Sequence, residues 1–227
     1  MGLMEVLRPA KEVPTTTWSA EDPMTIKPRK KTLVVLIIGL WIFGTGDAIL
    51  IAAGIGNTPW TVLAEGIAKN IDWSVGQATF LVSILVLLLW IPLKEKPGIG
   101  TILNAIIIAA AIEVMVPRLP TPDNEYLAIA QVLLGAVLIG IGSGIYLTAN
   151  LGPGPRDGWM TGLQRVSGIP ISRVRGTIEL TVLAIGWLVL GGTFGVGTIV
   201  FAILIGPVVA VCLNLAGRFG GSGEVHG

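Results

Sequence analysis

Charged side chains are scarce in this chain. They make up 13% of its 227 residues, whereas hydrophobic residues make up 52%, and soluble proteins carry about 25% charged residues. This composition excludes an ordinary soluble domain and predicts a protein embedded in lipid. The formal net charge of +1 also provides no basic surface for DNA or RNA, so we expect no nucleic-acid partner.

Cysteine and histidine each occur only once. Cys212 lies in an apolar run and has no second cysteine with which to form an internal disulfide. His226 is the second-last residue, which excludes a histidine metal site or a serine-histidine dyad within the membrane. We therefore expect no metal and no cofactor.

One string resembles an enzyme motif. Gly44-Thr45-Gly46-Asp47 matches the GxGD pattern of intramembrane aspartyl proteases, whose chemistry needs two carboxylates that share a proton. The other aspartates all lie outside the spans assigned below: Asp22, Asp72, Asp123 and Asp157. The missing partner argues against proteolysis, and we expect no enzyme activity.

One stretch of the chain occurs twice. Residues 39 to 66 align with residues 135 to 162 at an offset of 96. The matched positions are Gly39, Gly44, Gly46, Gly56, Pro59 and Gly66 on Gly135, Gly140, Gly142, Gly152, Pro155 and Gly162. After one inserted residue, Trp90, Gly98, Gly100 and Thr101 match Trp187, Gly195, Gly197 and Thr198. We interpret the chain as a duplication.

Six apolar segments are long enough to cross a bilayer, which takes about 20 residues for about 30 Å of hydrocarbon. They cover residues 33–53, 75–93, 100–116, 127–149, 174–192 and 197–216. Two shorter segments are 57–70, which contains Thr58-Pro59 near its start, and 156–167, which follows Gly154-Pro155; both pairs are typical helix starts. We interpret them as re-entrant or interfacial helices. This divides the chain into a flexible N-terminal tail (1–32), repeat A (33–116), an external linker (117–126), repeat B (127–216) and a C-terminal tail (217–227).

Basic residues predict the orientation. With six spans and both termini in the cytoplasm, all the lysines and arginines except Lys69 and Arg118 lie inside, as the positive-inside rule demands. Eight spans, in which the short segments also cross, fit almost as well, so this alternative stays open. Three crossings per copy force the copies to insert in opposite senses. The sequence thus predicts an all-α membrane protein with six transmembrane helices in two three-helix inverted repeats, each with a short re-entrant or interfacial helix.

Small residues predict where helices pack. Gly44 and Ala48 on the first span, and Gly140 and Gly144 on the fourth, are four residues apart. Such stripes let helix backbones approach closely within lipid. We expect these two matched helices to contact each other or symmetric neighbours.

Several strings resemble a known family. LGPGPRDGWMTGL, RGTIELTVLAIGWLVLGGTFGVGT, IGPVV and LLLWIPLKEKPGIGTILNA, within residues 33–216, resemble the YczE/YitT-like family of bacterial multipass membrane proteins. The resemblance implies a protein of the bacterial cytoplasmic (inner) membrane, of largely uncharacterised function, and supplies no catalytic residues. Arg156 and Asp157 of the PRDG string have no counterpart in the first copy, so their role is confined to one half.

Polar residues in or beside the spans are the candidate site, because a charge costs about 2.5 to 3.5 kcal/mol at the centre of a membrane helix. Asp47 lies in mid-span and matches the neutral Ser143. Glu179 lies in the fifth span, where an ion pair with Arg175 one turn earlier is the alternative explanation. The candidate substrate-binding residues are Asp47, Asn104, Asn150, Arg156, Asp157 and Glu179.

Two functions remain open. The first is a small-solute transporter or exporter, which binds a small molecule or ion at the interface of the repeats. The second is a non-transporting membrane subunit or scaffold, which binds a partner membrane protein or complex through its cytoplasmic arginines. Both place the protein in the lipid bilayer, and neither identifies a substrate.

Overall fold

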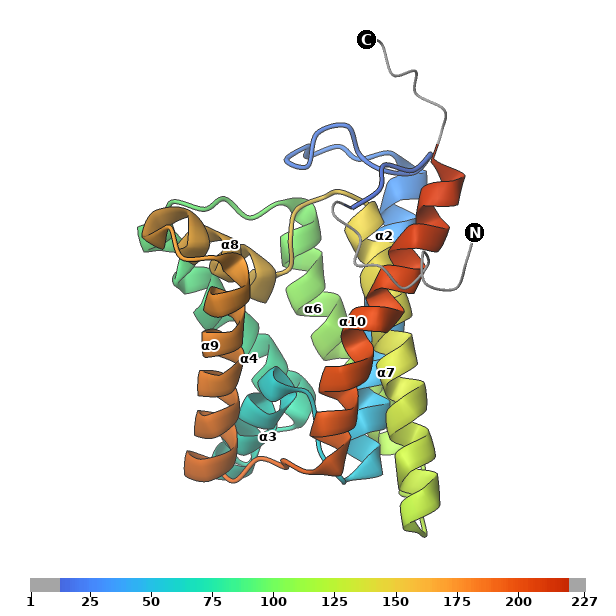
Figure 1. The fold of residues 1–227 in the computed structure, drawn as a ribbon, viewed down its shortest axis with the longest axis vertical. Coiled ribbons are helices and arrows are strands. Elements are labelled where there is room, and N and C mark those ends of the chain that lie inside the picture. Colours follow the sequence, from blue (N-terminus) through green and yellow to red (C-terminus); the bar gives the residue numbers. More distant parts are fainter. Residues whose placement is uncertain (1–12, 221–227) are drawn as a thin grey trace.

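The computed structural model describes residues 13–220, and all regular structure in this range is helical (Figure 1). The long helices are α2 (Lys30–Ala53), α4 (Val75–Leu88), α6 (Ile99–Met115), α7 (Glu125–Thr148), α9 (Ile171–Ala184) and α10 (Val196–Ala216). The short helices are α3 (Pro59–Ile71) and α8 (Pro155–Ser167). One turn, α5 (Trp90–Leu93), prolongs α4, a π-helix, η2 (Ile185–Val189), prolongs α9, and the 3-10 turns η1 (Val116–Arg118) and η3 (Gly217–Phe219) follow α6 and α10.

Five helical segments of the described range are long and apolar enough to cross a membrane. They are Lys30–Ala53, Val75–Leu93, Ile99–Arg118, Glu125–Thr148 and Val196–Phe219. The prediction of an all-α membrane protein is confirmed. The expected span 174–192 corresponds to α9 with η2 and is not one of the five. The observed helix α9 contains Arg173, Arg175 and Glu179, which make this segment more polar than the others.

Both short segments form helices, as the proline-containing starts predict. Each has 13 residues, or about 20 Å, which is too short to cross the hydrocarbon core. Thr58 caps α3 by accepting a hydrogen bond from the amide of Thr61, whereas Gly154 begins α8 without a side-chain cap. The starts of two related helices therefore differ in how their first amides are satisfied.

The helices α2 and α7 pack side by side and run in opposite directions (Figure 1). Their contact is made by glycines. A β-carbon on Gly142 would lie 2.7 Å from the carbonyl oxygen of Gly39, and a β-carbon on Gly46 would lie 2.7 Å from that of Gly135. No larger residue fits at these positions without movement of the backbones. Gly39 aligns with Gly135, and Gly46 aligns with Gly142, at the offset of 96. The two contacts are therefore equivalent in the alignment.

The expected helix-packing residues also lie at helix contacts. Gly44 faces Ala111 and Ile108 of α6, and its counterpart Gly140 faces Val208 of α10. Gly144 faces Cys212 of α10, and Ala48 is fully buried in α2. The first long helix of each copy therefore packs against the last long helix of the same copy.

The loop that precedes each short helix is held by the other copy. The carbonyl oxygen of Ile55 accepts a hydrogen bond from the amide of Gly197 at 2.9 Å, and that of Leu151 accepts one from the amide of Gly100 at 2.7 Å. Beside them, Gly56 and Gly152 have φ values of 128° and 100°, which only glycine adopts readily. The start of α10 fixes the loop of copy A, and the start of α6 fixes that of copy B.

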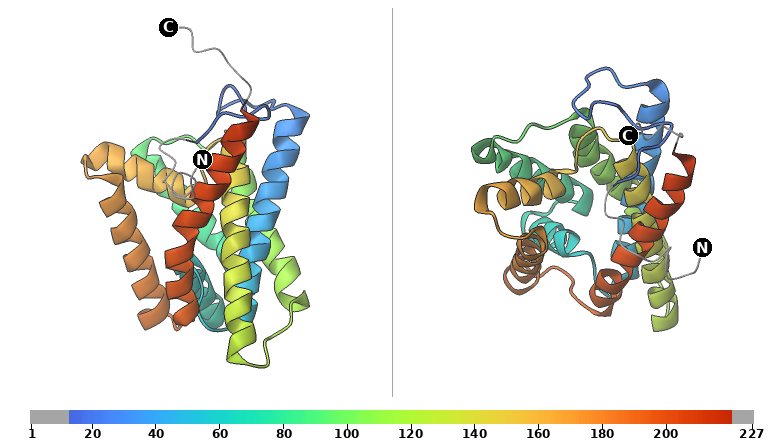
Figure 2. Two further views of the ribbon diagram at one scale, coloured as in Figure 1. Left: turned by 45° about the vertical axis from the view of Figure 1, so that its right-hand side comes forward. Right: turned by 45° about the horizontal axis from the view of Figure 1, so that its top comes forward.

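Two groups of helices surround separate hydrophobic clusters. One cluster includes Leu36 of α2, Ile112 of α6 and Tyr146 of α7, and the other includes Trp60 of α3, Val82 of α4 and Ile178 of α9. We call the helices α2, α6, α7 and α10 the first lobe, and α3, α4, α8 and α9 the second lobe (Figure 2). The first lobe takes two long helices from each copy, and the second lobe takes one short and one long helix from each copy. The chain therefore passes from one lobe to the other several times.

The expected tail of residues 1–32 is more structured than its composition suggests. The helix α2 already begins at Lys30. The Ser19 hydroxyl donates to the carbonyl oxygen of Thr148 at 2.6 Å, the Trp18 indole donates to the Thr148 hydroxyl at 3.0 Å, and the Ala20 amide donates to the carbonyl oxygen of Ala149 at 3.0 Å. These bonds hold residues 18–20 on the end of α7, although the sequence there has no apolar run that would predict an ordered segment. Residues 1–12 and 221–227, which include most of the expected C-terminal tail, lie outside the described range.

Candidate functional site

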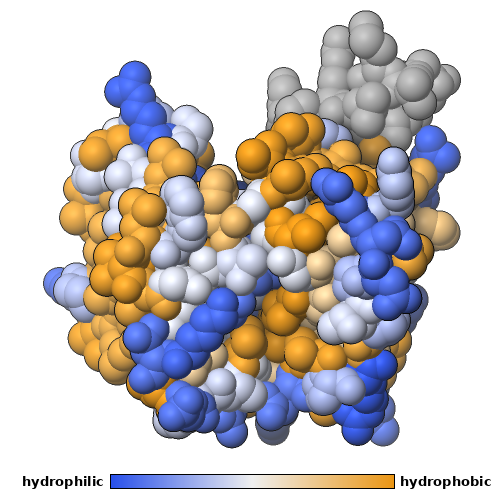
Figure 3. All heavy atoms as spheres, turned by 90° about the horizontal axis from the view of Figure 1, so that it is seen from below, coloured by the Kyte–Doolittle hydropathy of each residue, from blue (hydrophilic) through white to orange (hydrophobic). Residues whose placement is uncertain are grey.

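A cavity of about 690 Å³ lies between the two lobes. All eight helices named as lobe members contribute to its wall, and the molecule seen from below is hollowed between the lobes (Figure 3). Polar and charged wall residues come mainly from the second lobe and from α7. They are Thr58, Thr79, Ser83, Asn104, Ser143, Tyr146, Arg156, Asp157, Arg175 and Glu179. The cavity thus brings together side chains that are far apart in the sequence.

Trp60 and Arg156 lie at the starts of the two short helices and face the cavity. The guanidinium of Arg156 lies 5.1 Å from the centroid of the Trp60 ring, a cation–π arrangement. Within the described residues, this guanidinium has no hydrogen bond or ion pair. Burial lowers the pKa of Arg156, and its acidic neighbours Asp47 and Asp157 oppose that shift. Arg156 therefore presents unused donors to the cavity.

Asp47 lies behind the cavity wall. It is fully buried in α2, and its Oδ1 accepts a hydrogen bond from the Thr61 hydroxyl at 2.9 Å. The Thr61 hydroxyl is also 2.8 Å from the Thr58 hydroxyl. The other carboxylate oxygen, Oδ2, has no hydrogen-bond partner among the described residues. Asp47 thus joins the first lobe to the start of α3 in the second lobe, and Arg156 is its nearby positive charge.

Two further polar contacts organise the wall. The Tyr146 hydroxyl donates to Oδ2 of Asp157 at 3.0 Å, which connects α7 to α8. On α9, Nε of Arg175 donates to Oε1 of Glu179 at 2.9 Å. The structure therefore contains the ion pair of Arg175 with Glu179 that the sequence offered as the alternative explanation for a charge at position 179. It does not remove Glu179 from the site, because both partners line the cavity.

The two candidate asparagines lie in different places. Asn104 lines the cavity beside Gly154, where a β-carbon on the glycine would lie 3.2 Å from Nδ2 of Asn104. Asn150 follows α7 with a φ of 52°, and its Nδ2 donates to the carbonyl oxygen of Ala20 at 2.8 Å. Asn150 thus holds the N-terminal segment and is not part of the cavity wall.

Sequence reasoning missed several wall residues, among them Thr79, Ser83 and Trp60. Thr79 is 2% exposed, and its hydroxyl has no hydrogen-bond partner among the described residues, while the Ser83 hydroxyl donates to the carbonyl oxygen of Thr79. Neither differs from ordinary small polar residues of membrane helices. Trp60 did leave a signal, because the alignment of the two copies pairs it with Arg156. Within residues 13–220 no three histidine, cysteine or acidic side chains gather as a metal site.

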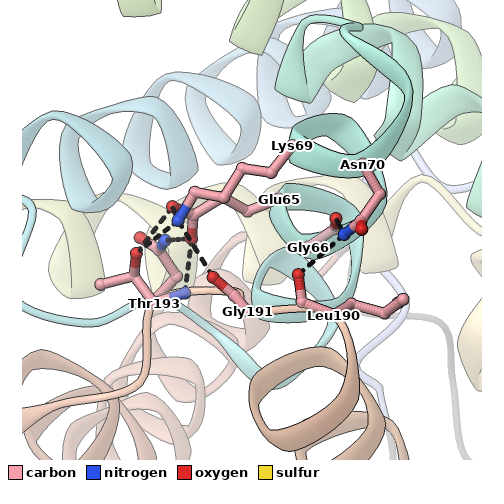
Figure 4. A network of polar contacts seen from close by, with 8 residues as sticks. Glu65, Gly66, Lys69, Asn70, Leu190, Gly191 and Thr193 are labelled. Carbon is pink, nitrogen blue, oxygen red and sulfur yellow. Dashed lines mark hydrogen bonds and ion pairs between the residues drawn. The ribbon is translucent and has the colours of Figure 1, made fainter.

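The far end of α3 is fixed by a separate polar network (Figure 4). Glu65 accepts hydrogen bonds from the amide of Thr193 at 2.9 Å and from its hydroxyl at 2.7 Å, and it pairs with Lys69 at 2.8 Å. Asn70 donates to the carbonyl oxygen of Leu190 at 2.9 Å. Although burial raises the pKa of Glu65, the hydrogen bonds from Lys69 and Thr193 outweigh it and hold this pKa below its usual value.

A related contact fixes the far end of α8. Arg165, which matches Lys69 in the other copy, donates to the carbonyl oxygen of Leu93 at 2.7 Å and pairs with Glu95 at 2.8 Å. Lys69 likewise reaches the carbonyl oxygen of Gly191 at 3.2 Å. In both copies a basic residue in the last turn of the short helix therefore binds the loop that follows the neighbouring long helix.

These features define a helical integral membrane protein with a polar cavity between two lobes. Residues 30–214 match the family described as "Family of unknown function (DUF6198)", and the chain belongs to this family. It is 40% identical over 206 residues to an uncharacterized protein of Haemophilus influenzae, covering 91% of this chain and 93% of the relative. It is 32% identical over 182 residues to the uncharacterized membrane protein YczE of Bacillus subtilis, covering 80% and 81%. The resemblance to the YczE-like family is thereby confirmed. No solved structure matches the chain.

Proposed function

We propose that the protein is a small-solute transporter or exporter of the bacterial cytoplasmic membrane. In this proposal six transmembrane helices form two inverted repeats, and the cavity between the lobes is the substrate site. The observation that carries it is that the starts of both short helices, at Trp60 and Arg156, meet at one polar cavity. Broken helices that converge on a site between inverted repeats are the usual arrangement of secondary transporters.

The paired contacts support the inverted repeat. Exchanging the copies turns the contact of Gly142 with Gly39 into that of Gly46 with Gly135. The same exchange turns the hydrogen bond from Gly197 to Ile55 into that from Gly100 to Leu151, which agrees with a pseudo-two-fold axis. Because α2 and α7 run in opposite directions (Figure 1), such an axis lies in the plane of the membrane.

A sixth crossing by α9 and η2 completes the proposal. Together they cover residues 171 to 189 and run in the opposite direction to α4 (Figure 1), with which α9 shares a hydrophobic cluster. Arg173 and Arg175 lie in the first turns, where the head-group region can solvate them, and Glu179 is paired with Arg175. The charged residues that make this segment more polar than the five apolar spans thus lie near its end or are paired. They do not prevent the segment from crossing the bilayer.

The connections between the lobes suit a rocking motion. Four connections join them, at residues 54–58, 94–98, 149–154 and 190–195. They are rich in glycine, with Gly54, Gly56, Gly98, Gly152, Gly154, Gly191, Gly192 and Gly195. Glycine absorbs changes in backbone angles more easily than other residues. Asp47 and Thr61 face each other across the lobes, so a change in the charge of Asp47 is the natural trigger.

Access to the cavity from both sides of the membrane tests transport. Ser143 lines the cavity, and Ser143→Cys in a Cys212→Ser background provides a single reactive thiol. A membrane-impermeant methanethiosulfonate should modify it in both right-side-out and inside-out vesicles. The control, Ser167→Cys at the exposed end of α8, should react only from the cytoplasmic side.

Two outcomes bear on the alternative. Asp47→Asn should fold and restrict labelling of Ser143→Cys to one side, because the amide holds one charge state. If Ser143→Cys in the parent protein reacts from one side only, or from neither, alternating access is wrong, and the non-transporting subunit becomes the better explanation.

A further inference from the structure

The cavity opens sideways, between α9 and α10. Ala202 and Gly206 of α10 line the cavity and are also exposed, and a β-carbon on Gly206 would have no heavy atom within 4 Å. From below, the hollow lies between the lobe that carries α9, on the left, and the lobe that carries α10, on the right (Figure 3). Leu180 and Ile203, on these two helices, are 68% and 67% exposed. An opening flanked by such residues at membrane depth faces lipid.

One wall of the cavity suits an anion. The guanidinium of Arg156 has no hydrogen bond or ion pair in the described chain, and α8 begins at Gly154, which cannot cap the amides of the first turn. Uncapped amides at a helix start favour negative groups. On another helix that lines the cavity, α4, the buried Thr79 hydroxyl also has no hydrogen-bond partner among the described residues. Three carboxylates lie near Arg156: Glu179 is paired with Arg175, Asp157 accepts a hydrogen bond from Tyr146, and Asp47 lies behind the wall, where it accepts one from Thr61.

The opposite wall is apolar. It is formed by one face of α10 together with residues of α2 and α7, namely Phe43, Ile139, Phe201, Ile205, Val209 and Leu213. The volume of about 690 Å³ lies within the range of roughly 300 to 1,000 Å³ typical of ligand pockets. A free ion would leave this apolar wall uncovered, whereas a molecule with one polar end and one apolar end would cover both walls.

We propose that the cavity takes up, from the bilayer, an amphiphile with one hydrocarbon chain and an anionic phosphate or carboxylate head group. The head group binds Arg156, the first amides of α8 and the Thr79 hydroxyl. The chain lies along α10 and passes out between α9 and α10. This names the substrate class of the proposed transporter and rests on that proposed function.

Binding of dodecyl phosphate tests the proposal. Native mass spectrometry of the protein released from a neutral detergent should show one dodecyl phosphate per chain. Arg156→Gln should weaken binding at least tenfold, and Arg156→Lys, which keeps the charge, should restore part of it. The matched control is Arg173→Gln, because Arg173 is exposed on α9 and is not in the wall. Gly206→Leu should also weaken binding, because the new side chain fills the opening.

Several results would overturn it. Equal affinity of Arg156→Gln and Arg173→Gln removes the anion site, and stronger binding of dodecyltrimethylammonium reverses its sign. Displacement by inorganic phosphate at equal concentration shows that the ligand is a small anion from water. A stable dimer with Gly206 buried at its interface shows that the opening holds a second copy. None of these results changes the two-sided labelling of Ser143→Cys, so failure of this inference can be distinguished from failure of transport.

Discussion

The guanidinium of Arg156 lies 5.1 Å from the centre of the Trp60 ring, and the two residues occupy the same position in the two copies of the repeat. Each is the second residue of a short helix. The alignment of residues 39–66 with residues 135–162 pairs these two positions, and both line one cavity, one with an aromatic ring and the other with a positive charge. This single contact connects α3 and α8.

The Trp60 and Arg156 side chains should be energetically coupled. A partly buried cation–π pair is worth about 0.5 to 2 kcal/mol, so Trp60→Leu and Arg156→Gln should destabilise the protein together by less than the sum of their separate effects. A double-mutant cycle on unfolding in detergent measures this difference. Trp60→Leu with Arg173→Gln is the control, and its effects should add. Additivity in the first cycle would show that the contact contributes nothing.

Gly46 should not tolerate even alanine. Its added β-carbon would lie 2.7 Å from the carbonyl oxygen of Gly135, so α2 and α7 must separate, at a cost of about 1 to 3 kcal/mol. The unfolding temperature of Gly46→Ala should fall clearly below that of the parent. Gly206→Ala should show no fall, because its β-carbon meets nothing within 4 Å. Similar temperatures for the two variants would contradict tight packing of α2 on α7.

Glu65 should make stability depend on acid. Burial raises its pKa, but the hydrogen bonds from Lys69 and Thr193 lower it further, so the folded pKa lies below the usual 4.5. A depressed carboxyl pKa adds stability that is fully present above pH 4.5 and is lost as the pH falls through the folded pKa. The parent should therefore exceed Glu65→Gln in unfolding temperature at neutral pH, and the gap should close below pH 4.5. A gap that is constant with pH would show that the charge of Glu65 has no stabilising role.

The connector between the copies should lie outside the cell. In the proposed topology, three crossings by the first copy bring Asp123 to the external side, so Asp123→Cys, in a Cys212→Ser background, should react with an impermeant methanethiosulfonate added to intact cells. Ser167→Cys should react only after the cells are opened. Reaction of Asp123→Cys only in opened cells would mean an even number of crossings in the first copy, and the inverted repeat would be wrong.

Much of the helical framework could be predicted from the sequence. Long apolar runs indicate helices in lipid because the backbone must satisfy its hydrogen bonds internally, and the Thr58-Pro59 and Gly154-Pro155 pairs mark the starts of α3 and α8 to within about two residues. The segment at residues 18–20 could not be predicted, because one backbone and two side-chain hydrogen bonds to the end of α7 hold it. Such bonds leave no pattern in composition.

The site was harder to predict than the fold. Charge in or beside the spans drew attention to Arg156, Asp157 and Glu179, and the structure places all three in the cavity wall. The same criterion cannot tell a wall residue from one behind the wall, where Asp47 lies, or from a residue that holds a loop, as Asn150 does. It also overlooks Thr79, whose hydroxyl becomes exceptional only when burial deprives it of a partner.

The crossed hydrogen bonds of the two loops restrict the order of assembly during synthesis. The carbonyl oxygen of Ile55 finds its partner only when Gly197, near the end of the chain, has emerged from the ribosome. Until then the loop before α3 lacks this bond, although α3 itself already contacts Asp47 of α2 and packs on α4. A nascent chain stalled before α10 should therefore remain vulnerable to membrane proteases and chaperones at its first loop, long after that loop was made.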